Sequence, residues 1–335
     1  MLYRRRLYSP QIDNNNKIVY IGSSKVKPAV LTEWGAEYND SKSTFNQDTG
    51  VGKIVFDGEI IRIPNSAFKQ LAELKSIVSM PQTVTVIRAS SFRFEETDTT
   101  LRSNLESITF HEGITAINER AFCFCRKLTE VKLPNTIKTL GHKVFYKCTG
   151  LTKITFGENL TKFHEDDSTT TANNGADFLY GCTSLTTIQW NAIECPDFLN
   201  SGYTPFTPDL PIDTVKFGSK VKYIPSYMFF KCEGIKSITI PESCTSIGDR
   251  AFQGCSGLTK VTVKATTPPK IVPGLAAYGG GFTAGDGKNC VFRYHDGSWK
   301  ILPKLTSIYV PADSVSKYKN DANWGIYSSI IKAIS

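Results

Sequence analysis

The stretch that decides the fold is LTEVKLPNTIKTLGHKVFYKCTGL, at residues 128–151, because its apolar template recurs on both sides. The template occurs upstream in LESITFHEGITAINERAFCFCRKL (105–128) and downstream in IKSITIPESCTSIGDRAFQGCSGL (235–258). Self-similarity at a fixed short period is typical of a solenoid, in which each repeat packs on its neighbours. We therefore predict a stack of short coils rather than separate globular domains.

Each repeat holds a strand segment and a turn segment. Alternation of period two in L-x-x-[IV]-x-apolar predicts a short strand, with Ile108 and Phe110 on one face and Thr109 on the other. The segment ending in A-F-x-x-C has three-to-four spacing, which predicts one or two helical turns. Stacking of parallel strands about 4.8 Å apart would give an α/β repeat solenoid.

Breaks in the repeat define the organisation of the chain. The last apolar strand position recurs at spacings of 23, 23, 34, 27, 23 and 23 residues, from Phe110 to Val263. The long spacings locate insertions, which in repeat proteins often hold ligands. The run KIVYIGSSKVKPAV predicts a hairpin near the start. The predicted units are an N-terminal cap with this β-hairpin at 1–53, repeats at 54–263 with insertions at 93–104, 164–177 and 194–211, an irregular inserted loop at 264–304, and a last repeat strand with a C-terminal cap at 305–335.

Composition and charge limit the classes of partner and the cellular compartment that we expect. The net charge is +8, but only Arg4, Arg5 and Arg6 form a basic cluster, so no nucleic-acid partner is predicted. No apolar run is long enough for a transmembrane segment. The start, MLYRRRLYSP, lacks the apolar region of a secretory signal. Five of the nine cysteines share one repeat phase, which predicts buried thiols rather than disulfides or a zinc site: Cys125, Cys148, Cys182, Cys232 and Cys255.

At these residues the chain resembles the BspA-like leucine-rich repeats, whose unit reads L-x-x-I-x-L-P-x-x-[VI]-x-x-I-G-x-x-A-F-x-x-C-x-x-L. The resemblance covers roughly 54–311, and 235–258 match it almost position for position. It implies a right-handed leucine-rich-repeat superhelix with a parallel β-sheet on its concave face. It also implies a surface or secreted protein of Bacteroidetes type, associated with adhesion, whose signal peptide has been removed. The family has no catalytic motif to carry over.

Strand side chains that leave the core define the first candidate binding surface. Extended concave surfaces bind partners in many solenoids, although Thr and Lys are also ordinary solvated strand residues. The lysines favour an acidic partner. The main candidates are Lys132, Lys153, Thr155, Gln189, Lys216, Thr239 and Lys260. The same face is predicted to include Ser107, Thr109, Glu130, Thr187, Thr214, Ser237, Thr262, Ser307 and Tyr309.

Aromatic residues in the insertions form the second candidate surface. They lie in polar or Gly-rich context outside the repeat positions, where they act either as anchors of a long loop or as anchors for a protein or glycan partner. The candidates are Tyr203, Phe206, Tyr278, Phe282, Tyr294 and Trp299.

No catalytic, cofactor or metal site is predicted. The acidic triplet at 165–167 lacks the spacing of a calcium loop, and GGG at 279–281 precedes no P-loop Lys-Ser or Lys-Thr pair. We therefore expect a non-catalytic, monomeric protein that binds an extracellular protein or glycan. Two alternatives stay open: an enzyme, such as a hydrolase, that uses His295 or Asp286 in the inserted loops, and a spacer that presents another domain.

Overall fold

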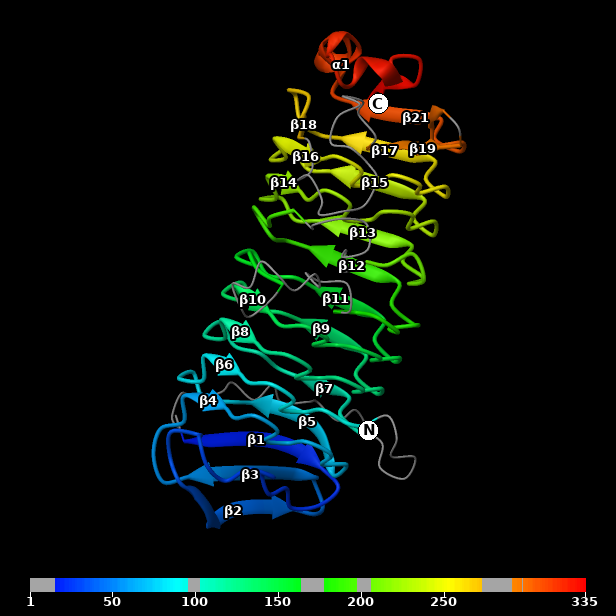
Figure 1. Cartoon of the computed structure of the whole chain (residues 1–335). Helices are drawn as coiled ribbons and strands as arrows, with labels where there is room; N and C mark the ends of the chain where they lie inside the picture. Colours follow the sequence, from blue (N-terminus) through cyan, green and yellow to red (C-terminus); the bar gives the residue numbers. More distant parts are fainter. Residues whose placement is uncertain (1–15, 96–102, 164–177, 198–205, 273–290, 297) are drawn as a thin grey trace, which may run out of the picture.

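The computed structural model describes residues 16–95, 103–163, 178–197, 206–272, 291–296 and 298–335. Its coils are stacked from an N-terminal sheet to a C-terminal cap (Figure 1). The first sheet has the order β2-β3-β1-β5-β7, in which β1 is antiparallel to β3 and β5, whereas β5 and β7 are parallel. Its strands are β1 (Lys17–Gly22), β2 (Tyr38–Asn46), β3 (Val51–Phe56), β5 (Leu74–Ser79) and β7 (Ser107–Ile108).

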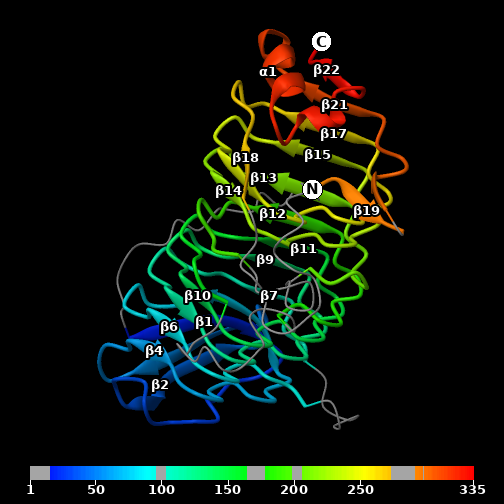
Figure 2. The ribbon, with the colours of Figure 1, turned by 45° about the horizontal axis from the view of Figure 1, so that its top comes forward.

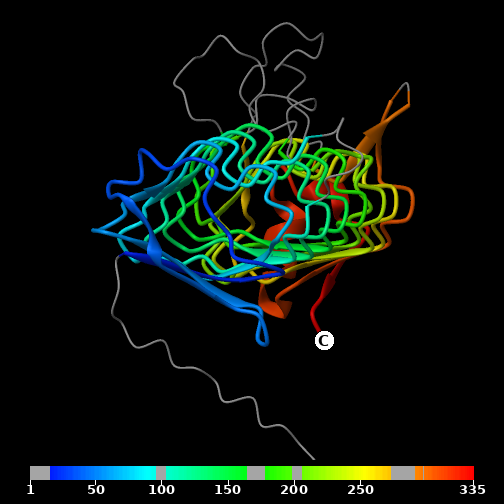
Figure 3. The same ribbon diagram turned by 90° about the horizontal axis from the view of Figure 1, so that it is seen from below.

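The repeats contribute two series of parallel strands, on opposite sides of each coil (Figures 1 and 2). The first series continues from β7 with β9 (Glu130–Lys132), β11 (Lys153–Thr155), β12 (Thr187–Trp190), β13 (Thr214–Phe217), β15 (Ser237–Ile240), β17 (Lys260–Val263), β21 (Ser307–Val310) and β22 (Ile331–Ala333). The second contains β4 (Arg62–Ile63), β6 (Val86–Ile87), β8 (Ala116–Ile117), β10 (Thr139–Leu140), β14 (Tyr223–Ile224), β16 (Ser246–Gly248) and β18 (Lys270–Val272). Viewed along the stack, successive coils superpose (Figure 3).

The A-F-x-x-C segment does not form the helical turns that its spacing predicted. Arg120 and Phe124, which flank Ala121-Phe122, both adopt left-handed φ values, 54° and 62°. An α-helix cannot pass through such residues, so the segment folds into successive tight turns. Its backbone N–H groups bond alternately within the turn, as from Cys125 to Phe122 O (3.1 Å), and to the next coil, as from Phe122 to Val144 O (2.9 Å). The regular elements of the described chain are consequently mostly strands, with little helix, and the predicted α/β class holds only in part.

Two ladders fill the interior. Phenylalanine rings stack from coil to coil, with centroids 5.0 Å apart for Phe92 and Phe122 and 5.4 Å apart for Phe122 and Phe145. Beside them, each repeat cysteine donates its thiol to a phenylalanine carbonyl of the preceding coil, as Cys148 does to Phe122 O at 3.1 Å. All eight described cysteines are buried and free, including the five for which the repeat phase predicted it.

The C-terminal end is closed by 3-10 helix η1 (Ala312–Ser314), helix α1 (Val315–Asn320) and 3-10 helix η2 (Gly325–Tyr327). Tyr318 and Trp324 are buried there, and each donates a hydrogen bond of 2.8 Å to a backbone carbonyl of the segment after β17, Ala265 O and Pro269 O respectively. These helices lie within the predicted C-terminal cap at 305–335 and cover apolar side chains that the last coil would otherwise expose.

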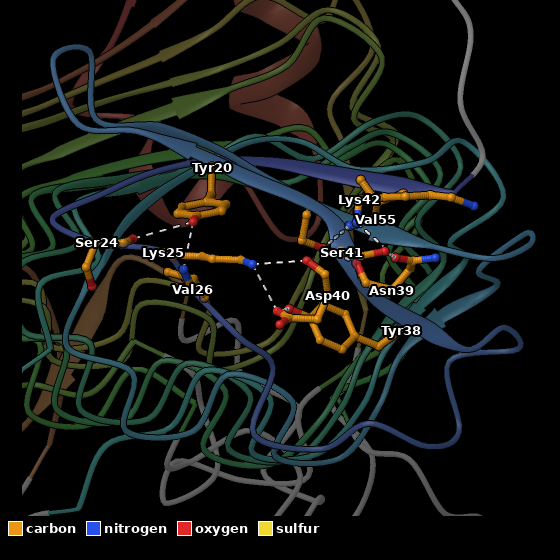
Figure 4. A network of polar contacts seen from close by, with 11 residues as sticks. Tyr20, Ser24, Lys25, Val26, Tyr38, Asn39, Asp40, Ser41, Lys42 and Val55 are labelled. Atoms are coloured by element: carbon orange, nitrogen blue, oxygen red, sulfur yellow. Dashed lines mark hydrogen bonds and ion pairs between the residues drawn. The ribbon is translucent and has the colours of Figure 1, made fainter.

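The N-terminal end is closed differently from the prediction. β1 finds its partners in β3 and β5, and the strands joined by a short turn are β2 and β3, so the hairpin does not lie within KIVYIGSSKVKPAV. The edge strand β2 is interrupted between Asn39 and Thr44 and carries a polar network (Figure 4). There Lys25 Nζ lies 3.0 Å from Asp40 Oδ1, and Ser43 Oγ accepts a bond from Val55 N. Bulges and charges of this kind protect a sheet edge from pairing with another chain.

Candidate functional site

The outward side chains of β7 to β22 in the first series form a surface that we call the sheet face. Strand register places its residues in two rows, because side chains at the same position of paired parallel strands point the same way. One row contains Glu130, Lys153, Thr187 and Thr214, and the other contains Lys132, Thr155, Gln189 and Lys216. The predicted sheet candidates of these four strands therefore do lie on one side.

Two of these candidates have partners within the surface itself. Lys153 Nζ lies 2.5 Å from Glu130 Oε1 on the neighbouring strand. Gln189 donates to Asn191 Oδ1 at 2.8 Å, and Asn191 donates to Phe156 O at 2.9 Å. The exposed ion pair contributes little stability, but it offsets the charge of Lys153. Lys132 and Lys216 remain exposed and have no ion pair among the described residues.

The C-terminal part of the sheet face holds a cluster of Lys260, Ser307, Tyr309 and Lys332, which we call the lysine–tyrosine cluster. Lys260 Nζ lies 4.8 Å from the centroid of the Tyr309 ring, within the range of a cation–π contact. Lys332 Nζ donates to Ser307 Oγ at 2.8 Å. Ser307, which was predicted to be exposed, is 7% exposed, and it accepts this bond from Lys332 on β22, the strand that pairs with β21.

The charge of the sheet face is strongly one-sided. Strands β9 to β22 of this series carry outward lysines at 132, 153, 216, 260 and 332, whereas Glu130 is the one acidic residue in these strands. Their formal charge is thus +4, five lysines less one glutamate. The acidic partner that the sequence favoured is compatible with this distribution.

Among the loop aromatics, Phe206 is not a surface anchor. Its side chain is fully buried, and its ring stacks on Phe229 with centroids 4.9 Å apart. Cys232 donates to its carbonyl, as the other repeat cysteines do to theirs. Phe206 therefore occupies the phenylalanine position of a coil, a position that the insertion made hard to recognise in the sequence. Tyr203, Tyr278 and Phe282 lie outside the described residues.

Tyr294 and Trp299 lie on the antiparallel pair β19 (Arg293–His295) and β20 (Trp299–Ile301). Tyr294 packs on the core, whereas the Trp299 ring contacts His295 at 5.0 Å and has the Arg293 guanidinium 5.8 Å from its centroid. This pair extends beyond the outline of the coils (Figure 3). Trp299 is half-buried, and its neighbours account for its position.

The described cysteines lack the exposure and lowered pKa of a reactive thiol. Burial raises the pKa of Cys123 to about 11 and of Cys182, Cys232 and Cys244 to about 12, which keeps these thiols protonated. His295 packs edge-on against Trp299, and Asp286 and the acidic triplet at 165–167 lie outside the described residues. Within the described ranges, no group of three or more His, Cys, Asp or Glu residues is placed to hold a metal ion, and no helix could span a membrane.

Comparison with known families identifies the repeat type of this architecture. Residues 39–166, 99–193 and 167–269 match the BspA type leucine rich repeat region, in six copies. The chain belongs to the BspA-type leucine-rich repeat family. The match spans 39–269, more than half of the chain, and so confirms the resemblance seen in the repeats. A search of curated proteins gave no match.

Solved structures with similarity to this BspA-type protein include three bacterial leucine-rich repeat proteins. A leucine rich cell surface protein from Faecalibacterium prausnitzii is 22% identical, with 77% of this chain and 65% of that chain aligned and a TM-score of 0.31. A protein from Eubacterium ventriosum is 22% identical over 56% of this chain and 42% of that one, with a TM-score of 0.37. A Bacteroides ovatus protein is 16% identical over 98% and 100%, with a TM-score of 0.36. The aligned region thus spans less than two thirds of the first two proteins.

Sequence reasoning missed two features of the sheet face. The pairing of Glu130 with Lys153 has a sequence signal, since the two residues are one repeat of 23 apart and so must face each other across paired strands. The position of Lys332 has none. It reaches the sheet face because the chain returns through α1 and η2 before β22 pairs with β21, outside the repeat template.

Proposed function

We propose that this BspA-type protein is a non-catalytic protein of the bacterial surface or the extracellular medium that binds a protein or glycan partner through its sheet face. The observation that carries the proposal is the row of Lys132, Thr155, Gln189 and Lys216, which exposes cations at both ends. Adhesion to a host or a neighbouring cell is the role that suits such a surface. The β19–β20 pair, with Trp299, is a secondary contact region in this proposal.

We also propose that the stacked coils form a right-handed superhelix with the sheet face on its concave side. The parallel, in-register pairing of β9, β11, β12 and β13 supports this geometry. A concave surface would let a long partner contact several coils at once.

Charge reversal on the sheet face tests the binding role. The double variant Lys132→Glu/Lys216→Glu is expected to weaken capture of a partner from extracellular-matrix and glycan arrays by about tenfold or more, because it reverses the charge of both cations of the row that carries the proposal. The matched control is Lys138→Glu/Lys270→Glu, which makes the same charge change on the other side of the coils. Lys138 precedes β10 and Lys270 lies on β18, both in the second strand series. Undiminished capture by the first variant would move the binding site away from this row.

A further inference from the structure

In the lysine–tyrosine cluster, each lysine side chain reaches toward the β21 residue that is in register with the other lysine. Lys260 is in register with Ser307, yet its ammonium lies over the Tyr309 ring. Lys332 is in register with Tyr309, yet its ammonium bonds Ser307 Oγ. Both ammonium groups therefore flank the same two side chains of β21, and one ligand group at Tyr309 could contact both.

The positive charge of this cluster is uncompensated by neighbouring strands. β15, β17, β21 and β22 contain no Asp or Glu, and neither Lys260 nor Lys332 has an ion pair among the described residues. Both lysines are exposed, and their contacts are a ring face and a hydroxyl, which leave ammonium protons available for an anion. Charge complementarity thus favours an anionic ligand group at this place.

The surroundings of the cluster favour a sugar over a polypeptide. Hydroxyl side chains flank it at Ser237, Thr239 and Thr262. Protein interfaces rely on a central group of buried aromatic and apolar anchors. None of the exposed large apolar side chains of the described residues belongs to β9, β11, β12, β13, β15, β17 or β21. A polar partner rich in hydroxyl groups matches this composition better.

We propose that the lysine–tyrosine cluster binds carboxylate groups of an acidic polysaccharide, with the nearby threonine hydroxyls contacting sugar hydroxyls. This inference rests on the proposed function, since it names the class of partner for the same sheet face. Lys216 and Lys132 extend the site along the stack. They lie on β13 and β9, three strand spacings or roughly 14 Å apart. A linear polymer with regularly repeated carboxylates can contact several of these lysines, which raises its affinity by multivalency.

Binding of polygalacturonate to immobilised full-length chain tests the proposal, with neutral dextran and poly-L-glutamate as comparison probes. Lys260→Gln/Lys332→Gln is expected to weaken polygalacturonate binding by about tenfold or more. The control Lys138→Gln/Lys270→Gln changes the net charge equally and is expected to bind as the parent does. Tyr309→Ala, which keeps both charges but removes the ring under Lys260, is expected to cause a smaller loss. Unchanged urea midpoints would establish that all variants are folded.

Each other outcome overturns the inference. Unchanged affinity of Lys260→Gln/Lys332→Gln would place the anion site elsewhere, and equal losses in the control pair would show a response to net charge alone. Equally tight binding of poly-L-glutamate, lost in the same variant, would make the partner an acidic polypeptide. If no form of the chain binds polygalacturonate, the acidic-polysaccharide proposal fails, while the array test with Lys132→Glu/Lys216→Glu still decides the proposed function.

Discussion

At the scale of single residues, Phe206 shows how an insertion conceals a repeat position. Its aromatic, proline-rich surroundings at 194–211 indicated a loop, yet its ring stacks in the core on Phe229. Phe206, Phe229 and Phe252 are separated by 23 residues each, so the repeat spacing counted back from Phe252 would have identified it. The local composition therefore gave the wrong prediction. The insertion disturbs the 23-residue spacing before Phe206 but not after it.

Phe206→Ala is expected to lower the free energy of unfolding by about 3–5 kcal/mol, because it removes a fully buried ring and leaves a cavity between Trp190 and Phe229. Urea unfolding followed by circular dichroism measures the change. Tyr180→Ala, at a ring that is 43% exposed, is the control and should cost much less. A loss below about 1 kcal/mol for Phe206→Ala would contradict its placement in the core.

At the scale of elements, the strands were predictable and the turn segments were not. Alternation of period two identified the strands of the first series, such as β9 and β17, since few structures other than a strand use that period. Three-to-four spacing before Cys125 and Cys148 fits a helical turn and a pair of tight turns equally well. The two differ in backbone φ, which side-chain spacing does not report. The short strands of the second series, such as β8 and β10, are two residues long and too brief to show a period.

The left-handed residues of these turns have a measurable energetic cost. Gly254 adopts φ +75°, and a Cβ there would lie 2.9 Å from Lys231 Cγ, so Gly254→Ala is expected to destabilise the protein by about 1–2 kcal/mol. Lys231 adopts φ 57° at the matching position of the preceding coil. Lys231→Gly relieves the strain there and is expected to leave stability unchanged or raise it by up to about 1 kcal/mol. Thermal and urea unfolding check both signs; a stabilising Gly254→Ala would count against the turn geometry.

At the scale of the whole molecule, the buried cysteines make the free energy of unfolding depend on pH in the alkaline range. Burial raises the pKa of all eight described thiols, Cys125, Cys148, Cys195 and Cys255 among the most strongly affected. Unfolded thiols ionise near pH 8.5. Above that pH the unfolded chain holds fewer protons than the folded chain, so stability is complete at neutral pH and falls as pH rises.

The free energy of unfolding is expected to fall steeply with pH because the contributions of the thiols add. Each thiol that stays protonated in the folded state contributes a loss of about 1.4 kcal/mol per pH unit, and eight approach roughly 11 kcal/mol per unit near pH 10. Urea midpoints at pH 7, 9 and 10 under reducing conditions measure this loss. Cys244→Ala should reduce the slope by about one thiol's share. A midpoint that is constant up to pH 10 would refute the prediction.

The left-handed position before each core alanine or its equivalent has a consequence for the surface chemistry along this edge. Ser66, Ser90, Arg120, Lys143 and Tyr227 share that conformation, although their side chains differ in size and charge. The backbone there is fixed by bonds to the adjoining coil, as from Arg120 N to His142 O, and not by any one side chain. The column therefore accommodates serine, lysine, arginine and tyrosine in different coils on one backbone conformation. The surface chemistry along this edge can thus differ from coil to coil above the same core, and neighbouring coils are coupled where two of these side chains meet, as Arg250 and Tyr227 do.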